Sequence, residues 1–214
     1  MKCEIAPSVL SFPHGEIQPR VAELVAAGAS LIHLDVMDGQ FVPPITFGDG
    51  LAASLRSIPG IRLEAHLMTV TPDRHFEAFV KSGCFRVIFH AEATAHSHRL
   101  IQTLHGMGVQ AGIAINPGTS VAAVREVLHL ADHCLIMTVN PGWGGQAMIR
   151  EALDKVRKVR AMRPDIEIQV DGGIDATTLP LAREAGANLF VVGSHLLAYN
   201  SLAEAAQTLN KLCQ

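Results

Sequence analysis

Eight short runs of apolar and β-branched residues recur along the chain, and segments with helical patterning separate them. The runs occupy residues 4–10, 30–37, 61–68, 85–91, 109–116, 133–140, 166–172 and 188–194. Continuous apolar strands that alternate with helices are typical of a parallel sheet covered by those helices. Eight such units in order predict a closed (β/α)8 barrel, the TIM barrel of the α/β class. We therefore expect a single barrel domain over residues 1–214.

The segments between the runs carry apolar residues at helical spacing, and several end on glycine, the usual helix stop. They predict helices within residues 21–29, 49–60, 75–83, 99–108, 122–132, 151–162, 178–187 and 201–212. A flavodoxin-like or Rossmann sheet is the alternative. The G-x-G-x-x-G motif of a Rossmann fold, however, does not follow the first run.

The composition favours a globular protein that binds neither nucleic acid nor membranes. Hydrophobic residues make up 49% of the sequence, and 17 basic against 20 acidic residues give a net charge of -3. No basic block, apolar signal segment or bilayer-spanning stretch of roughly 18 apolar residues is present. The four cysteines are widely spaced and are expected to be reduced: Cys3, Cys84, Cys134 and Cys213. These features predict a cytoplasmic protein.

The stretch LIHLDVMDGQFVPP, residues 31–44, places charged residues in an otherwise apolar run. Alternate residues of a strand point the same way, so His33 and Asp35 both face the barrel interior. His66 ends the third run and Asp171 ends the seventh. Two imidazoles and two carboxylates suit Zn²⁺, Fe²⁺, Mn²⁺ or Co²⁺ better than Ca²⁺ or Mg²⁺. We expect one such divalent ion; the alternative is ordinary core histidines and helix-capping aspartates.

Other polar and soft residues lie near strand ends. Asp38 starts the loop after Asp35 and serves either a turn or the orientation of a metal ligand. His90 and Asn116 also end strands and could border a substrate. Three methionines are either core residues or an apolar lining above the metal: Met37, Met68 and Met137. The remaining histidines are expected on the surface or in helices, without a role: His14, His75, His96, His98, His105, His129 and His133.

Glycine-rich turns follow the last three strands, at residues 140–146 (NPGWGGQ), 171–173 (DGG) and 192–194 (VGS). Backbone amides in such turns can approach an anion, and the loops after strands seven and eight of a barrel commonly bind phosphate. The sequence therefore predicts a phosphate site beside the metal site, with purely structural turns as the alternative.

The sequence resembles the ribulose-phosphate 3-epimerase family through motifs that run in order from residue 7 to 194: PSVLS, HLDVMDGQFVP, HLM, MTVNPGWGGQ, VDGGI and VGS. The resemblance implies a (β/α)8 barrel that interconverts D-ribulose 5-phosphate and D-xylulose 5-phosphate, commonly as a homo-oligomer. It also implies one divalent metal held by four residues, His33, Asp35, His66 and Asp171, with the two aspartates as acid and base. Inversion next to a ketone needs a proton carrier on each face of the substrate.

The resemblance further assigns contacts with the sugar phosphate. Ser8 would bind a substrate hydroxyl, and His66 would lie beside the substrate. The phosphate end would be held by Gly142, Trp143, Gly144, Gly145, Gly172, Gly173, Gly193 and Ser194.

Several residues depart from the family pattern, all in loops around the expected pocket: Phe12, Pro13, Pro44, Trp143 and His195. They affect which sugar would fit the pocket, so a 3-epimerase of another ketose phosphate, such as a six-carbon one, is an alternative.

A decarboxylase or Schiff-base aldolase on the same kind of barrel would need a lysine at a strand end. The lysines instead fall at the N-terminus or in predicted helices: Lys2, Lys81, Lys155, Lys158 and Lys211. A non-catalytic phosphosugar- or metal-binding barrel is also possible, although binding alone needs no pair of aspartates.

Overall fold

Each of the eight apolar runs forms a strand, and all neighbouring strands pair in parallel. The computed structural model describes residues 3–214, so Lys2 lies outside the described residues. The strands are β1 (Glu4–Pro7), β2 (Leu31–Met37), β3 (Arg62–Met68), β4 (Cys84–His90), β5 (Gln110–Ile115), β6 (His133–Met137), β7 (Glu167–Asp171) and β8 (Leu189–Val192).

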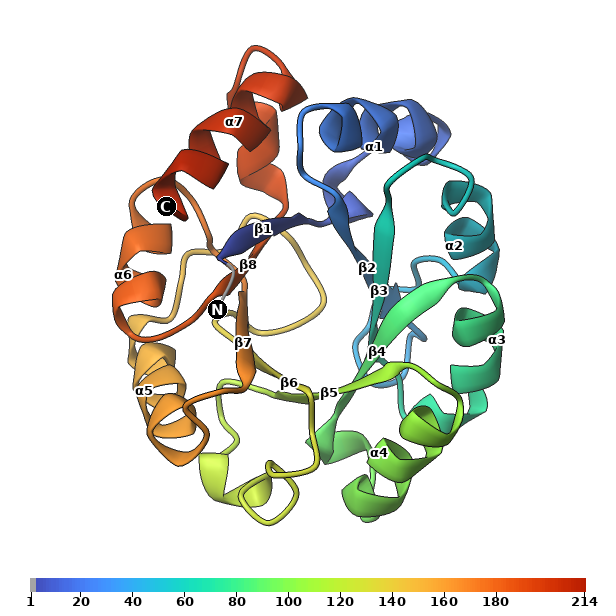
Figure 1. Cartoon of the computed structure of the whole chain (residues 1–214), viewed down its shortest axis with the longest axis vertical. Helices are drawn as coiled ribbons and strands as arrows, with labels where there is room; N and C mark the ends of the chain where they lie inside the picture. The colour runs from blue at the N-terminus through green and yellow to red at the C-terminus, as the bar shows by residue number, and fades with distance from the viewer. Residues whose placement is uncertain (1–2) are drawn as a thin grey trace.

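The sheet follows the order β1-β8-β7-β6-β5-β4-β3-β2, so its two end strands are β1 and β2. A single parallel bridge between Ser8 and His33 joins these ends. The sheet is thereby a nearly closed barrel, with helices around its outside (Figure 1). The predicted (β/α)8 barrel is confirmed.

Seven α-helices of the described chain surround the barrel: α1 (Ile17–Ala26), α2 (Asp49–Leu55), α3 (Phe76–Lys81), α4 (Ser97–Gly106), α5 (Leu153–Met162), α6 (Thr178–Glu184) and α7 (Leu202–Leu212). Short 3-10 helices complete the connections: η1 (Val9–Ser11), η2 (His14–Glu16), η3 (Pro72–Arg74), η4 (Ala91–Ala93), η5 (Val121–Ala123), η6 (Arg150–Ala152) and η7 (Ser194–Ala198). Most predicted helices are confirmed, although α1 and α4 begin before their predicted starts and the others are shorter than predicted.

The segment between β5 and β6 differs from its prediction as an α-helix. Within residues 122–132 the chain forms turns instead, in which Val124 N–H donates to the Val121 carbonyl and Val127 N–H to the Val124 carbonyl. Valines three residues apart match the three-residue period of these bonds, and their β-branching weakens the α-helix. The turns still bury Val121 and Val124 against the sheet.

Side chains that point out of the barrel pack against the helices and form the larger core, which includes Phe76, Phe79 and Phe89. Inside the barrel, Ile88 and Leu135 belong to one smaller apolar cluster, and Leu31 and Leu189 belong to another. Polar side chains that are fully or almost fully buried lie among these clusters: His33, Glu64, His66, Arg86, His90, His133 and Gln169. The barrel interior therefore combines apolar clusters with buried polar groups.

The prediction that His133 lies on the surface or in a helix is wrong. It begins β6 and is fully buried in the barrel interior, because its strand position shares the inward face with Leu135 and Met137. Burial, reinforced by the nearby charge of Arg86, lowers the pKa of His133 well below its ordinary value. It is therefore a neutral core imidazole.

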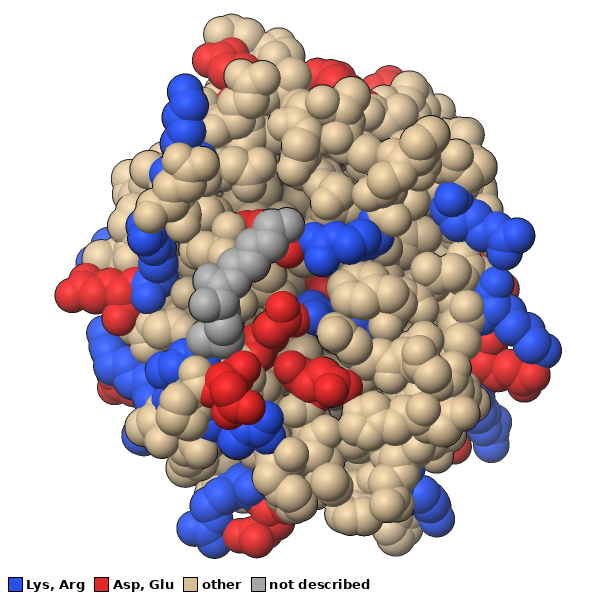
Figure 2. Space-filling view, in the orientation of Figure 1, with Lys and Arg blue, Asp and Glu red and all other residues tan. Residues whose placement is uncertain are grey.

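The surface carries charged side chains of both signs (Figure 2). Basic and acidic side chains lie next to one another on the face shown in Figure 2. No helix among residues 3–214 is long and apolar enough to cross a membrane.

All four cysteines are free thiols, and burial raises the pKa of Cys84 and of Cys134 to about 12. Every lysine of the described chain lies in a helix rather than at a strand end.

The barrel interior has no room for a side chain at Gly112. A Cβ atom there would lie 2.7 Å from Ile88 Cγ1 and 2.9 Å from His133 Nδ1. We expect Gly112→Ala to lower the free energy of unfolding by about 1–3 kcal/mol, because overpacking strains a dense interior. Urea denaturation measures this change. Gly106→Ala, at a position with open space in α4, is the control and should not lose stability. Equal midpoints for Gly112→Ala and the wild type would contradict the packing argument.

Candidate metal centre and active site

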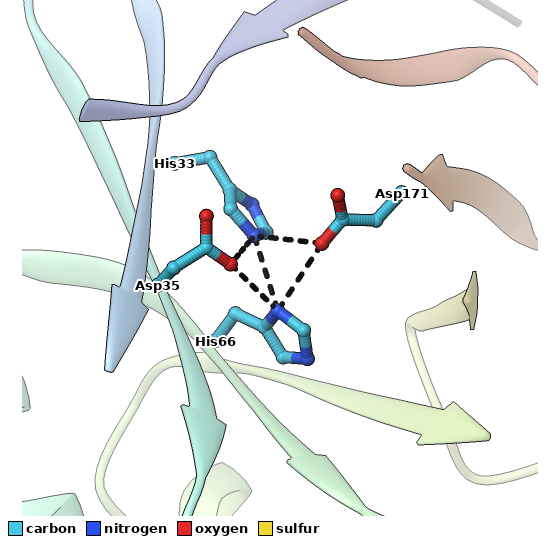
Figure 3. A group of neighbouring side chains, drawn as sticks. All are labelled: His33, Asp35, His66 and Asp171. Atoms are coloured by element: carbon cyan, nitrogen blue, oxygen red, sulfur yellow. Dashed lines mark hydrogen bonds and ion pairs between the residues drawn. The ribbon is translucent and has the colours of Figure 1, made fainter. Parts of the chain in front are cut away.

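Four polar side chains converge at the carboxyl ends of three strands. His33 and Asp35 lie on β2, His66 on β3 and Asp171 at the end of β7. Asp35 and His66 are direct partners in the β2–β3 register, so their side chains stand next to each other on the inward face. Figure 3 shows all four side chains pointing toward one another, with Asp35 and Asp171 approaching from opposite sides.

The distances between the donor atoms match a metal centre. His33 Nε2 lies 3.3 Å from Asp35 Oδ1, 3.3 Å from His66 Nδ1 and 3.7 Å from Asp171 Oδ2. His66 Nδ1 lies 3.1 Å from Asp35 Oδ1 and 3.4 Å from Asp171 Oδ2. Four ligands held tetrahedrally at 2.0–2.1 Å from one ion would be separated by about 3.3 Å. The group is therefore able to bind a metal ion, and its donor types fit Zn²⁺, Fe²⁺, Mn²⁺ or Co²⁺.

The electrostatics of the group favour a cation at its centre. His33 and His66 are fully buried, and Asp35 almost so. Burial alone would raise the pKa of Asp35, but the charges and hydrogen bonds of His33 and His66 outweigh it and hold that pKa far below its ordinary value. Burial alone would lower the pKa of His33, and the charge of Asp35 together with hydrogen bonds to Asp35 and Glu64 raises it instead. The carboxylates thus stabilise positive charge among the donor atoms.

Neighbouring groups fix the carboxylate of Asp35 and the backbone of Asp171. The Ser8 hydroxyl donates to Asp35 Oδ2 at 2.6 Å, which leaves Asp35 Oδ1 facing the imidazoles. Thr138 N–H and its hydroxyl both donate to the Asp171 carbonyl, at 2.7 and 2.9 Å. The end of β7 is therefore anchored to the chain that follows β6.

A pocket opens above the four donors and collects the other predicted residues. Asp35 and Asp171 reach into it, whereas His33 and His66 lie beneath its floor. The predicted contact and lining residues that border it are Ser8, Met37, Met68, Met137, Gly142, Trp143, Gly144, Gly145, Gly172, Gly173, Gly193 and Ser194. Residues that are distant in the sequence thus meet at one site, as the barrel geometry predicts.

Two glycines of the DGG turn are required by close packing. Gly172 has φ +115°, and a Cβ there would lie 2.3 Å from Val139 Cγ2. Gly173 has φ +65°, and a Cβ there would lie 2.4 Å from the backbone nitrogen of Met148. A side chain at either position would push the turn after β7 away from the loop after β6. The glycines therefore bring two pocket loops into contact.

Three other polar residues predicted near strand ends, Asp38, His90 and Asn116, lie outside the pocket lining. Asp38 accepts hydrogen bonds from the backbone of Gln40, Phe41 and Val70, so it serves the turn. His90 and Asn116 do not border the pocket in the described chain. His90 Nε2 instead lies 2.8 Å from His66 Nε2, below the pocket.

Glu64 is a further residue of the site that no motif in the sequence indicated, and its carboxylate lies 2.8 Å from His33 Nδ1. Its position was visible in the sequence, since Glu64 lies two residues before His66 and so faces the same way.

Of the departures from the family pattern, only Trp143 lines the pocket, whereas Phe12, Pro13, Pro44 and His195 do not. Trp143 borders the pocket and is 57% exposed. Pro44 lies against the loop at Gly142, where its Cδ would be 3.6 Å from a Cβ. Phe12 is buried beneath the Arg20 guanidinium, and the His195 ring packs edge-on against Tyr199.

Comparison with known proteins identifies the family. The sequence model described as "Ribulose-phosphate 3 epimerase family" matches residues 4–197. The chain belongs to the ribulose-phosphate 3-epimerase family. It is 43% identical over 196 residues to the ribulose-phosphate 3-epimerase of Bacillus subtilis, covering 89% of this chain and 90% of that protein. It is 46% identical over 194 residues to the enzyme of the same name from Treponema pallidum, covering 89% of each. Members of this family are epimerases, so the chain is an isomerase.

Solved structures of lower sequence similarity share the barrel. The 3-keto-L-gulonate-6-phosphate decarboxylase of Vibrio cholerae superposes with a TM-score of 0.75 at 16% identity, covering 100% of this chain and 98% of that one. The 3-hexulose-6-phosphate synthase of Salmonella typhimurium superposes with a TM-score of 0.74 at 16% identity, covering 98% of each. These likenesses concern the fold alone.

The geometry predicts that the four donors act together in metal binding. We expect the wild type to bind one equivalent of Co²⁺ or Zn²⁺, and His66→Ala to weaken binding more than about 100-fold, because it removes a direct ligand. Metal titration against a competing chelator measures both. His105→Ala is the control, since this exposed histidine pairs with Asp132 on the surface. Unchanged affinity in His66→Ala would exclude it as a ligand.

Proposed function

We propose that this epimerase interconverts D-ribulose 5-phosphate and D-xylulose 5-phosphate by a metal-dependent, two-aspartate mechanism. One observation supports it above all: Asp35 and Asp171 approach one pocket from opposite sides, above two buried imidazoles. The names of the similar proteins from Bacillus subtilis and Treponema pallidum support the same substrate.

Inversion at C3 requires a proton to leave one face of the carbon and another to return to the opposite face. The two aspartates are suited to this because they stand on β2 and β7, with the pocket between them. In one direction Asp35 accepts the C3 proton and Asp171 donates one, and the reverse reaction exchanges these roles. Ser8, bound to Asp35 Oδ2, keeps that carboxylate in place and lies where a substrate hydroxyl can reach it.

His33, Asp35, His66 and Asp171 would together hold one divalent ion. When bound, the ion acts as a Lewis acid that stabilises the negative charge developing on the C2 and C3 oxygens of the substrate. The buried imidazoles and the soft side chains of Met37, Met68 and Met137 limit the access of water to this region.

The phosphate of the substrate is proposed to bind where the loops after β6, β7 and β8 meet. None of the described residues that line the pocket is Lys or Arg, so the anion would be held by backbone amides and hydroxyls. Gly144, Gly173 and Gly193 permit close approach there, and Ser194 adds a hydroxyl. Such a site recognises phosphate by geometry rather than by a fixed positive charge.

A six-carbon ketose phosphate is the second candidate substrate. Trp143 stands at the pocket rim and Pro44 supports the adjoining loop at Gly142, so the opening is formed in part by departures from the family pattern. A non-catalytic binding role is less well supported, because binding a phosphosugar needs no carboxylate on each face.

We further propose a cytoplasmic homo-oligomer. The free, mostly buried thiols support a reducing compartment. The exposed apolar side chains of Ile45, Val70 and Trp143 support burial of surface in an assembly.

The two-aspartate proposal predicts the effect of isosteric amides. We expect Asp35→Asn and Asp171→Asn each to lower kcat by at least about 100-fold, because each removes a proton carrier. Exchange of the C3 proton with solvent, followed by NMR in deuterated buffer, measures the half-reaction directly. Asp38→Asn removes the same charge from a turn three residues away and should retain activity within a few-fold. Near-normal epimerisation in either active-site variant would exclude the mechanism.

The substrate proposal predicts an ordered set of rates. We expect metal-dependent turnover of D-ribulose 5-phosphate, slower turnover of allulose 6-phosphate and about 100-fold lower kcat/KM for unphosphorylated ribulose, because the phosphate site is then empty. A coupled assay before and after chelation measures these rates. Preference for the hexose phosphate would select the second candidate. Trp143, the single tryptophan of the chain, gives an independent binding signal by fluorescence.

A further inference from the structure

A row of polar side chains continues from the metal site into the barrel, across three neighbouring strands. In the register of the sheet, His33 on β2 is the partner of Glu64 on β3, and Glu64 is the partner of Arg86 on β4. All three side chains point inward and are buried, with exposed fractions of 0%, 0% and 2%. Burial of such groups is costly unless each one is paired, so their contacts require an explanation.

The contacts of Glu64 are all with hydrogen-bond donors. Arg86 Nη1 donates to Glu64 Oε2 at 2.9 Å, and Gln169 Nε2 donates to Glu64 Oε1 at 2.6 Å. A guanidinium has no acceptor, so the carboxylate that it binds is itself an acceptor. His33 Nδ1 lies 2.8 Å from Glu64 Oε1 and must therefore carry the hydrogen of that contact.

This arrangement selects one tautomer of His33. With hydrogen on Nδ1, the neutral imidazole presents a lone pair on Nε2, the atom that faces Asp35 and His66 at 3.3 Å each. We propose that Glu64, held by Arg86, is a positioning residue that keeps His33 oriented for the metal through Nε2. This inference rests on the metal site of the proposed function and goes beyond it, since Glu64 contacts His33 at Nδ1 and not at the Nε2 atom that would bind the metal.

The net charge of Glu64 and Arg86 indicates that they position His33 and do not attract the metal ion. Glu64 and Arg86 cancel each other, so together they add no net charge beneath the site. Arg86 is itself fixed by Gln110 and by Glu167, at the other end of the strands. The contacts from Arg86 through Glu64 to His33 therefore hold the ring in place, and this ion pair adds no net charge beside the metal centre.

The variant Glu64→Gln tests the inference because it keeps the shape and changes the donor pattern. An amide offers one acceptor, and the charged guanidinium of Arg86 competes for it with His33. If the amide NH2 faces His33, Nδ1 must accept, and the hydrogen moves to Nε2, where it blocks the metal. We expect Co²⁺ affinity to fall about 10- to 100-fold and the visible absorption bands of bound Co²⁺ to shift.

The matched control is Glu167→Gln, which removes a carboxylate from the same arginine at a side chain that is 37% exposed. We expect Co²⁺ affinity within about twofold of the wild type, with unchanged absorption bands, because His33 keeps its partner. Equal loss in both variants, or no loss in either, would overturn the positioning role. A wild type that binds no Co²⁺ would overturn the proposed metal site and this inference together.

Nitrogen NMR of the Zn²⁺-loaded wild type tests the tautomer without any variant, and so decides the question if Glu64→Gln fails to fold. We expect a hydrogen-bonded proton on Nδ1 of His33 and metal coordination at Nε2. Coordination at Nδ1, or a proton on Nε2, would overturn the inference even if the metal binds and the enzyme is active.

Discussion

The packing of two imidazoles and two carboxylates into one largely buried space is the constraint on which the site depends. The donor atoms of these groups lie within 4.8 Å of one another, and both imidazoles are completely buried. Without a cation, the carboxylates stabilise protons on the imidazoles, as the raised pKa of His33 shows. A divalent ion would satisfy the same carboxylates and accept the lone pairs of the rings. Burying these groups is energetically costly, and a bound divalent ion would offset that cost. A metal centre therefore fits here.

The parallel register of the sheet determines where these four side chains meet. Because parallel strands end at the same side, a histidine and an aspartate at strand ends can meet only at the carboxyl face of the barrel. The β2–β3 register places Asp35 beside His66 and, one step below, His33 beside Glu64. The closing bridge between Ser8 and His33 lies at the same level, so the joint of the barrel and the site share residues.

The pocket above the centre combines rigid and variable parts. Gly172 and Gly173 are fixed by contacts that a Cβ would break, and Thr138 holds the end of β7. Trp143, in contrast, extends from its loop and is mostly exposed. The rigid part surrounds Asp35 and Asp171, the proposed proton carriers, whereas the exposed part borders the entrance of the pocket.

The sequence by itself determined the barrel and the four donors, because strand and helix periods and the position of a residue within its strand are local properties. It also determined which glycines line the pocket, since their turns follow predicted strands. It could not determine that residues 122–132 form turns rather than an α-helix, because packing against distant strands decides this. The burial of His133 was predictable, since its place in the run 133–140 puts it on the same face as Leu135. Only the tertiary structure showed that Glu64, Arg86 and Gln169 contact one another beneath His33, since Gln169 is 105 residues from Glu64 and meets it through barrel closure. Local pattern predicts the direction in which a side chain points, but the partner that it meets there depends on the register and closure of the whole sheet.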